Sequence, residues 1–311
     1  MVKISKIKIK SFLIGIIIGL VLAGTGVYAA IMYQSSEVGY DNSNSGLTST
    51  NVQAALDELY EEQQIPSPNS FSTDSWSTIK KAIKSGNTSN YNVGDTKIID
   101  MGSLGTHTLR IANKSTPSEC SGSGFSQTAC GFVIEFEDII TTHRMNPWDS
   151  SITTSGNGNI GGWPASELRT YVNSDIYNAL PTDLKSAIIN TTVVSGHGSN
   201  DSSNFTSTDK LYLLSTHEVY KDVDGKTNSG IDPYDTAYNN TRQLDYYSSQ
   251  NVTTSYYSGA IKQYNSSNSY WWLCSAYSNI NSTFYHVYNT GNWSYYTSNA
   301  TYGVSPAFRI G

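Results

Sequence analysis

The chain has 311 residues, of which 25 are acidic, 19 are basic and 23 are tyrosine. Four of the basic residues lie among the first ten, so 15 basic residues face 25 acidic ones in the remainder, an excess of ten negative charges. Such a surface repels nucleic acid and anionic lipid head groups, and neither is expected as a partner. Low charge with abundant Asn, Ser, Thr and Tyr suits an extracellular domain rather than a cytosolic enzyme.

Residues 1–33 have the pattern of an export segment. Four lysines and no acid precede the apolar run from Phe12 to Tyr33. This order keeps the N-terminus inside and delivers the rest of the chain outside, so an extracellular or cell-surface location is expected. Small residues around Ala29 favour cleavage of a signal peptide, whereas the length of the run also allows an uncleaved membrane anchor through residues 11–33. The sequence leaves both open.

Residues 34–69 are expected to form a short helical neck and a linker. Thr50 and Gln53 have the spacing of a capping box, and the apolar residues between Val52 and Leu59 fall on one helical face. A helix of about three turns is marginal alone, so this stripe should pack on the main domain or on a second copy through residues 52–59. The segment resembles short modules in the stalks of bacterial surface proteins and phage tail proteins. The alternative is a simple N-terminal helix of the domain, and the prolines in 63–69 indicate a linker.

Residues 70–311 are expected to form one α+β domain of short helices and a mainly antiparallel sheet. Apolar spacing from Trp76 to Ile83 predicts a helix that ends at Gly86, and alternating apolar residues predict a hairpin over 91–113. Further elements are expected as a strand over 132–140, short helices and a strand over 161–194, a strand over 210–214, a helix over 241–247 and a strand over 306–310.

The three cysteines divide into a pair and a single residue. Cys120 and Cys130 flank a short Gly- and Ser-rich stretch, and in an exported protein they are expected to form a disulfide, with two free thiols as the alternative. Cys274 lies in an apolar strand pattern and is expected to be a small buried residue.

Catalytic patterns are weak. The histidines at 143, 197, 217 and 286 form no HExxH or other metal-ligand spacing, so no metal is expected. Glu135 and Glu137 share one face of a strand and could do acid-base chemistry, but a solvated strand face is the preferred interpretation. The protein is therefore not expected to be an enzyme, and no cofactor is implied.

The segment from Tyr270 to Tyr302 contains no Lys, Arg, Asp, Glu, Gln, Met or Pro. Rigid tyrosines with adaptable Ser, Gly and Asn form the composition that antibody loops use for binding. The alternative is a tyrosine-rich sheet with polar turns, because strands favour Tyr and Thr. The candidate ligand-binding residues are Tyr277, Asn279, Asn281, Tyr285, His286, Tyr288, Asn289, Asn292, Tyr295, Tyr296 and Asn299.

Two motifs frame this segment. SYWWLCSA, followed about thirty residues later by GVSPAFRIG, resembles the C-terminal pattern of C-type-lectin-like domains in bacterial surface proteins, where WWLRSA and GVRPAFRI take these places. Cys274 therefore stands where the pattern has Arg, which puts in doubt the ion pair that this Arg would make. The resemblance covers roughly residues 90–311. It implies a lectin-like fold with Trp271, Trp272 and Phe308 in the core.

The segment is also similar to the variable proteins of diversity-generating retroelements, whose C-termini are rewritten at adenines. Mutagenised Asn codons yield Asn, Tyr, Ser, Thr, Asp, His, Ile and Phe, and residues 275–302 fit that alphabet. An AT-rich genome would enrich several of the same residues. Residues 275–302 are thus a candidate variable face. Asn292-Trp293-Ser294 lacks the acid of the calcium-binding triplets in lectins, so calcium-dependent sugar binding is not expected.

These observations predict an exported adhesin or receptor-like protein that binds an extracellular protein or a glycan. The first alternative is a structural component of a cell surface or tail-fibre-like array, held together by the neck. The second is an enzyme of the sulfatase-modifying type, which shares the lectin fold. That chemistry needs activated thiols close together, and the sequence around Cys274 offers no second cysteine.

Overall fold

The computed structural model describes residues 34–64, 66–147, 158–225 and 230–311. They divide into two compact units, 1–64 and 65–311. The predicted export segment, residues 1–33, lies outside the described residues. Among the helices that are described, none is long and apolar enough to span a membrane.

The described residues of the first unit form the helix α2 (Val52–Gln64) and the loop before it. Asn51 rather than Thr50 caps the helix, because its Oδ1 accepts a hydrogen bond from the Ala54 N–H at 2.8 Å. The loop folds back on the helix through the Glu58 carboxylate, which accepts hydrogen bonds from Thr48 and Ser49. Hydrogen bonds therefore hold this unit more than apolar burial does.

The second unit begins with the predicted helix, α3 (Trp76–Ser85). Ser75 caps its N-terminus, and Gly86 ends it in the left-handed conformation at φ 71°, which a glycine adopts without strain. The buried side chains of Trp76, Ile79 and Ala82 form its inner stripe.

A four-stranded antiparallel sheet has the order β1-β2-β3-β13. Its strands are β1 (Thr96–Asp100), β2 (Thr106–Asn113), β3 (Val133–Phe136) and β13 (Ala307–Arg309). The last strand of the chain thus pairs with an early one.

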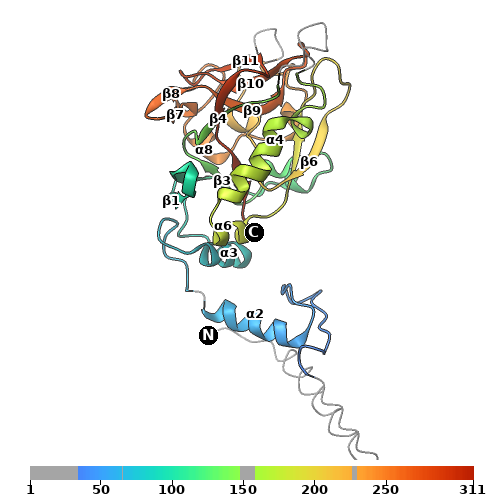
Figure 1. The fold of residues 1–311 in the computed structure, drawn as a ribbon, viewed down its shortest axis with the longest axis vertical. Helices are drawn as coiled ribbons and strands as arrows, with labels where there is room; N and C mark the ends of the chain where they lie inside the picture. The colour runs from blue at the N-terminus through green and yellow to red at the C-terminus, as the bar shows by residue number, and fades with distance from the viewer. Residues whose placement is uncertain (1–33, 65, 148–157, 226–229) are drawn as a thin grey trace, which may run out of the picture. The chain divides into compact units, whose positions relative to one another are not determined.

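The second sheet has five strands in the order β11-β10-β9-β12-β4. They are β4 (Thr141–Arg144), β9 (Trp271–Ala276), β10 (Thr283–Val287), β11 (Trp293–Thr297) and β12 (Thr301–Val304). All pairs are antiparallel except β12 with β9. Figure 1 shows this sheet at the end of the unit opposite to α3.

Two separate hairpins complete the strands. They are β5 (Thr191–Ser195) with β6 (Phe205–Asp209), and β7 (Lys262–Tyr264) with β8 (Ser267–Ser269).

The remaining helices are short. They are α4 (Glu167–Tyr171), α5 (Tyr177–Ala179), α6 (Thr182–Ala187), α7 (Thr216–Val219) and α8 (Asp245–Ser249), with a π-helical turn between α4 and α5. The architecture is therefore α+β with mostly antiparallel sheets, as predicted.

Two local expectations were wrong. Residues 210–214 form no strand but a single bridge between Tyr212 and Ala307, because the N–H groups of Lys210 and Leu211 donate to the Asn173 side chain and not to a neighbouring strand. The expected helix over 241–247 begins only at Asp245. The core residues of the framework motifs were predicted correctly, since Trp271, Trp272 and Phe308 are fully buried.

Candidate functional site

Strands β10 and β11 sort the aromatic side chains onto two faces of the sheet. Tyr285 lies opposite Tyr295 in the register, and Phe284 lies opposite Tyr296. Because successive side chains of a strand point to opposite faces, Tyr295 and Tyr296 cannot share one. The candidate binding residues therefore form two surfaces rather than the single face that the sequence predicted.

The first surface centres on the stacked rings of Tyr277 and Tyr295. Their centroids are 4.0 Å apart and their planes differ by 9°. Tyr234, from a loop far away in the sequence, lies 5.1 Å from Tyr277. Tyr285 is fully buried beneath them and its hydroxyl donates to the Ile231 carbonyl. Only Tyr295 on this surface is well exposed, at 37%.

The second surface is a tyrosine patch, defined here as Tyr270, Tyr288, Tyr296 and Tyr302. Tyr270 stacks on Tyr302 at 5.1 Å and meets Tyr288 edge-on at 4.5 Å. Tyr296 reaches across the sheet to within 5.9 Å of Tyr302. Tyr288 and Tyr296 are 39% and 53% exposed. Residues from β11, β12 and the ends of β9 and β10 thus present one aromatic surface.

His286 lies at the base of this patch. Its ring centroid is 4.8 Å from that of Tyr302 and between 5.9 and 6.2 Å from those of Tyr270, Trp272 and Tyr288. The side chain is buried, and neither ring nitrogen has a hydrogen-bond partner among the described residues. Burial lowers the pKa of His286 to about 4, so the ring is neutral at pH 7.

The other candidate residues lie at opposite ends of the β10–β11 hairpin. Asn279, Asn281 and Asn299 belong to the loops at one end, and Asn289 and Asn292 to the turn at the other. Asn279 and Asn299 are exposed, whereas the other three are half-buried. Three candidates are buried, namely Tyr277, Tyr285 and His286, so their side chains contribute little to the surface on which the sequence placed them.

Sequence reasoning missed Tyr270 and Tyr302 as members of the patch. Both flank the uncharged segment, and a strand period of two counted from Trp272 would have placed Tyr270 on the same face. The contribution of Tyr302 depends on β12 lying beside β9, which no local pattern reveals.

Glu135 belongs to a buried charge network and not to a solvated strand face, which corrects the sequence-based interpretation. It accepts hydrogen bonds from Arg110 and Lys262 at 2.8 Å and from the Tyr247 hydroxyl at 2.8 Å. Burial opposes its charge, but the two cations prevail and lower its pKa to about 2. Glu137 is partly exposed and lies 3.5 Å from Arg110. Both carboxylates are therefore ion-paired with Arg110.

Cys274 lies near a second buried acidic group, Glu218. Burial raises the pKa of the Cys274 thiol, and the nearby carboxyls of Glu218 and Asp235 raise it further. Glu218 is held by Thr128, Thr241 and the Ser215 N–H, and burial raises its pKa to about 7. Among the described residues, no cation is hydrogen-bonded to Glu218. An arginine at position 274 would lie beside acidic groups. In this chain hydroxyl groups and backbone amides donate hydrogen bonds to those acidic groups instead.

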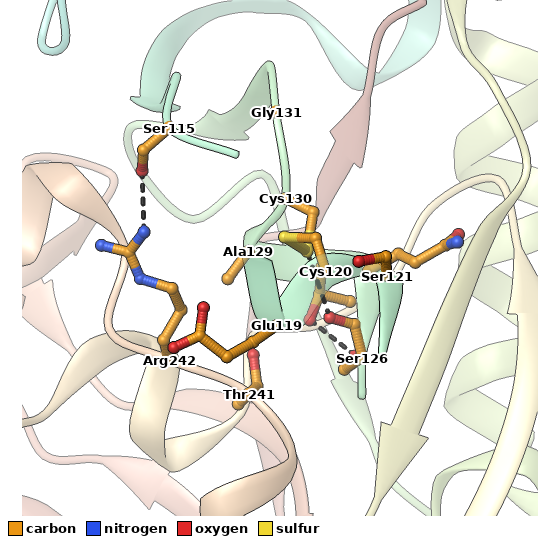
Figure 2. Close-up of a disulfide and its surroundings, with 12 residues drawn as sticks. Ser115, Glu119, Cys120, Ser121, Ser126, Ala129, Cys130, Gly131, Thr241 and Arg242 are labelled. Carbon is orange, nitrogen blue, oxygen red and sulfur yellow. Dashed lines mark hydrogen bonds between the residues drawn. A yellow bond between two sulfur atoms is a disulfide. The ribbon is translucent and has the colours of Figure 1, made fainter. Parts of the chain in front are cut away.

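The disulfide between Cys120 and Cys130 is present (Figure 2). Its loop is anchored at one end and near its middle, because the Cys130 carbonyl accepts from the Arg309 side chain and the Ser126 N–H donates to the Asn240 carbonyl. Figure 2 shows Arg242 nearby, whose guanidinium donates to the Ser115 hydroxyl at 2.9 Å.

The histidines are not brought together. His143 stacks on Tyr171, His217 stacks on Tyr238, and His197 bonds to the neighbouring Gly198 carbonyl. Within the described residues, His, Cys, Asp and Glu form no cluster of three that could hold a metal ion.

The second unit thus defines a class: an α+β domain of mostly antiparallel sheets that carries an aromatic, uncharged surface. Residues 139–311, more than half of the chain, match the family described as "Domain of unknown function (DUF6273)". The chain belongs to this family. No curated protein and no solved structure matches it.

The matched region is smaller than the compact unit. It begins at Ile139, after β1 to β3, yet β13 at its end pairs with β3. The β3–β13 pairing places the first three strands in the same sheet as the family region. The unit that folds is therefore larger than the region that matches.

Proposed function

We propose that the protein is an exported cell-surface protein that binds an extracellular ligand through the tyrosine patch and the adjoining part of β11. The carrying observation is the convergence of four tyrosines, in or next to the consecutive strands β9 to β12, on one surface whose members are uncharged. Tyrosine rings give large contact area at low entropic cost, and two of these four are well exposed.

The fold resemblance supports this proposal. A C-type-lectin-like domain holds its terminal strand against an early strand and displays the segment between them on a rigid scaffold. The pairing of β13 with β3 and the placement of residues 275–302 in β10, β11 and their loops agree with that arrangement. Loops and strand edges on a rigid scaffold are common binding sites.

The direct test compares Tyr296→Ala with the wild-type chain. Both are screened against a phage-displayed library of random peptides and an array of glycans, and the affinity of a recovered ligand is measured by titration. Tyr296→Ala should weaken binding by about tenfold or more, the usual size for a central aromatic contact. Circular dichroism should be unchanged. A folded variant with unaltered affinity for every recovered ligand would exclude the patch.

We further propose that residues 275–302 are diversified by a retroelement. Deep sequencing of the 3′ end of the gene from a growing population tests this. Substitutions confined to adenine positions are expected, concentrated in codons such as those of Asn279, Tyr288, Tyr296 and Asn299. A uniform sequence would indicate a fixed binder.

The alternative, an assembly component, is favoured by one observation in the first unit. Leu56, Leu59 and Tyr60 of α2 are exposed, at 49%, 44% and 65%, and among the described residues of this unit only Ala55 is buried. A second copy could cover this apolar stripe. Sedimentation of the full chain should then show an oligomer that becomes a monomer on Leu56→Glu. A monomeric wild-type chain would rule out this role for α2.

A further inference from the structure

Strand β11 is an open edge of the five-stranded sheet, because β10 is its only partner strand among the residues that the structure describes. The hydrogen bonds that flank the strand define which of its groups are free. Tyr288 N–H donates to the Asn292 carbonyl, and Ser298 N–H donates to the Ser282 carbonyl. Since bonded pairs alternate in an antiparallel ladder, Ser294 and Tyr296 bond to β10, and Trp293, Tyr295 and Thr297 direct their N–H groups outward.

The outward groups have few partners. No hydrogen bond is recorded for the N–H groups of Trp293, Tyr295 or Thr297 among the described residues, or for the Tyr295 carbonyl. The Trp293 carbonyl accepts only a long contact of 3.4 Å from the Asn292 amide, and the Thr297 carbonyl accepts from Ala300 N–H. Unpaired backbone groups in a row are a template for another strand.

This edge also lacks the devices that usually prevent such pairing. The strand Trp-Ser-Tyr-Tyr-Thr has no charge, no proline and no glycine, and it is rich in strand-favouring residues. The opposite edge of the sheet differs. There β4 carries Arg144, whose guanidinium pairs with Glu167 of α4 at 3.1 Å. A charged pair thus lies on one edge of the sheet and disfavours pairing with another strand there, whereas the β11 edge carries no charge.

We propose that β11 binds an extended segment of a protein partner as an additional antiparallel or parallel strand. This inference rests on the proposed function and names its ligand class, a polypeptide rather than a glycan. An added strand points alternate side chains to the two faces of the sheet. One set meets Trp293 and Tyr295, and the other meets Tyr296 and the tyrosine patch. Strand addition therefore explains how exposed tyrosines on opposite faces serve one ligand.

The first experiment compares Thr297→Pro with Thr297→Val in the full-length chain. The probe is the tightest peptide recovered from a phage-displayed library of random peptides. Proline removes the outward N–H of residue 297 and leaves the bonds of Ser294 and Tyr296 to β10 intact. Thr297→Pro should weaken peptide binding by about tenfold. Thr297→Val keeps the N–H and should bind like the wild type.

The second experiment measures amide hydrogen exchange by NMR with and without the same peptide. The amides of Trp293, Tyr295 and Thr297 should exchange rapidly in the free protein and slowly in the complex. Those of Ser294 and Tyr296 should be protected in both states. Protection that appears on every second residue is a signature of strand pairing, and contact with a sheet face does not produce it.

Three outcomes would overturn the proposal. If Tyr296→Ala abolishes binding while Thr297→Pro and the exchange pattern show no effect, the patch binds its ligand without strand addition, and the proposed function survives. If neither variant affects any recovered ligand, the proposed function fails as well. If the outward amides are already protected without peptide in a concentration-dependent dimer, a second copy occupies the edge.

Discussion

Tyr295 and Tyr296 are adjacent in the sequence but lie on opposite faces of β11. Tyr295 stacks on Tyr277 with ring centroids 4.0 Å apart, whereas Tyr296 lies 5.9 Å from Tyr302 in the tyrosine patch. The two residues therefore have different neighbours and different exposures, 37% and 53%. Substitutions at these two positions can therefore distinguish an effect on folding from an effect on binding.

Replacing each tyrosine by alanine should have different effects on stability. Tyr295→Ala removes a stacked pair and should lower the free energy of unfolding by about 1–2 kcal/mol. Tyr296→Ala should lower it by about 0.5 kcal/mol, because half of that ring is exposed. Urea unfolding of both variants, with Phe substitutions as controls, measures the difference. Equal losses would show that the two faces are not packed as described.

In the buried network at Glu135, removing the carboxylate should lower the free energy of unfolding more than removing one of its two cationic partners. Glu135→Gln leaves Arg110 and Lys262 without their carboxylate and should lower the free energy of unfolding by about 3–5 kcal/mol. Lys262→Met leaves Glu135 bonded to Arg110 and to Tyr247, so its cost should be smaller. Chemical denaturation of both variants at pH 7 tests this order, which a larger loss in Lys262→Met would contradict.

His286 should reduce stability at neutral pH through its two orphan nitrogens. His286→Phe keeps an aromatic ring in the patch and removes both polar atoms, so the free energy of unfolding should rise by about 1 kcal/mol. Thermal unfolding at pH 7 measures the change. A loss of stability would mean that the imidazole has a hydrogen-bond partner in solution.

Glu218 and His286 should make opposing contributions to the pH dependence of stability. The pKa of Glu218 is raised from 4.5 to about 7 in the folded state, so its contribution is fully present below pH 4.5 and is lost as the pH rises through 7. The pKa of His286 is lowered from 6.5 to about 4, so its contribution is present above pH 6.5 and is lost as the pH falls through 4. Each contributes up to about 3 kcal/mol.

Two variants separate these contributions. In His286→Phe, stability should rise relative to that of the wild type as the pH falls from 7 to 5, because the His286 contribution no longer opposes that of Glu218; burial also lowers the pKa of His217, which contributes alike in both variants. In Glu218→Gln, stability should fall over the same interval. The slope of the free energy of unfolding with pH is the readout, since Glu218→Gln also disturbs the hydrogen bonds from Thr128 and Thr241. Parallel slopes in the two variants would contradict both assignments.

Reduction of the disulfide should lower stability without unfolding the domain. Opening a loop of this length costs about 2–3 kcal/mol by the chain-entropy estimate. The loop stays anchored through Arg309 and Asn240. The double variant Cys120→Ser with Cys130→Ser should remain folded and should unfold at a lower urea concentration.

In the wild-type chain a thiol reagent should react with Cys274 only after denaturation, because that thiol is buried. Reaction of the native protein would disprove its burial.

The features that the sequence alone determined are those set by a few neighbouring residues. Local spacing determines where α3 begins and ends, the hairpin of β1 and β2, and the burial of Trp271 and Trp272. This is because side-chain period and backbone preference act over one or two turns. The α+β class follows from the same patterns. So does the uncharged character of the segment from Tyr270 to Tyr302.

The tertiary structure alone decided which of these residues face solvent and which are buried. Glu135 is buried because Arg110, 25 residues away, and Lys262, 127 residues away, supply its counter-charges. The tyrosine patch forms because β12 lies beside β9, and β11 remains open because no described strand follows it in the sheet. Strand order and burial depend on contacts between segments far apart in the chain, and no local pattern encodes those contacts.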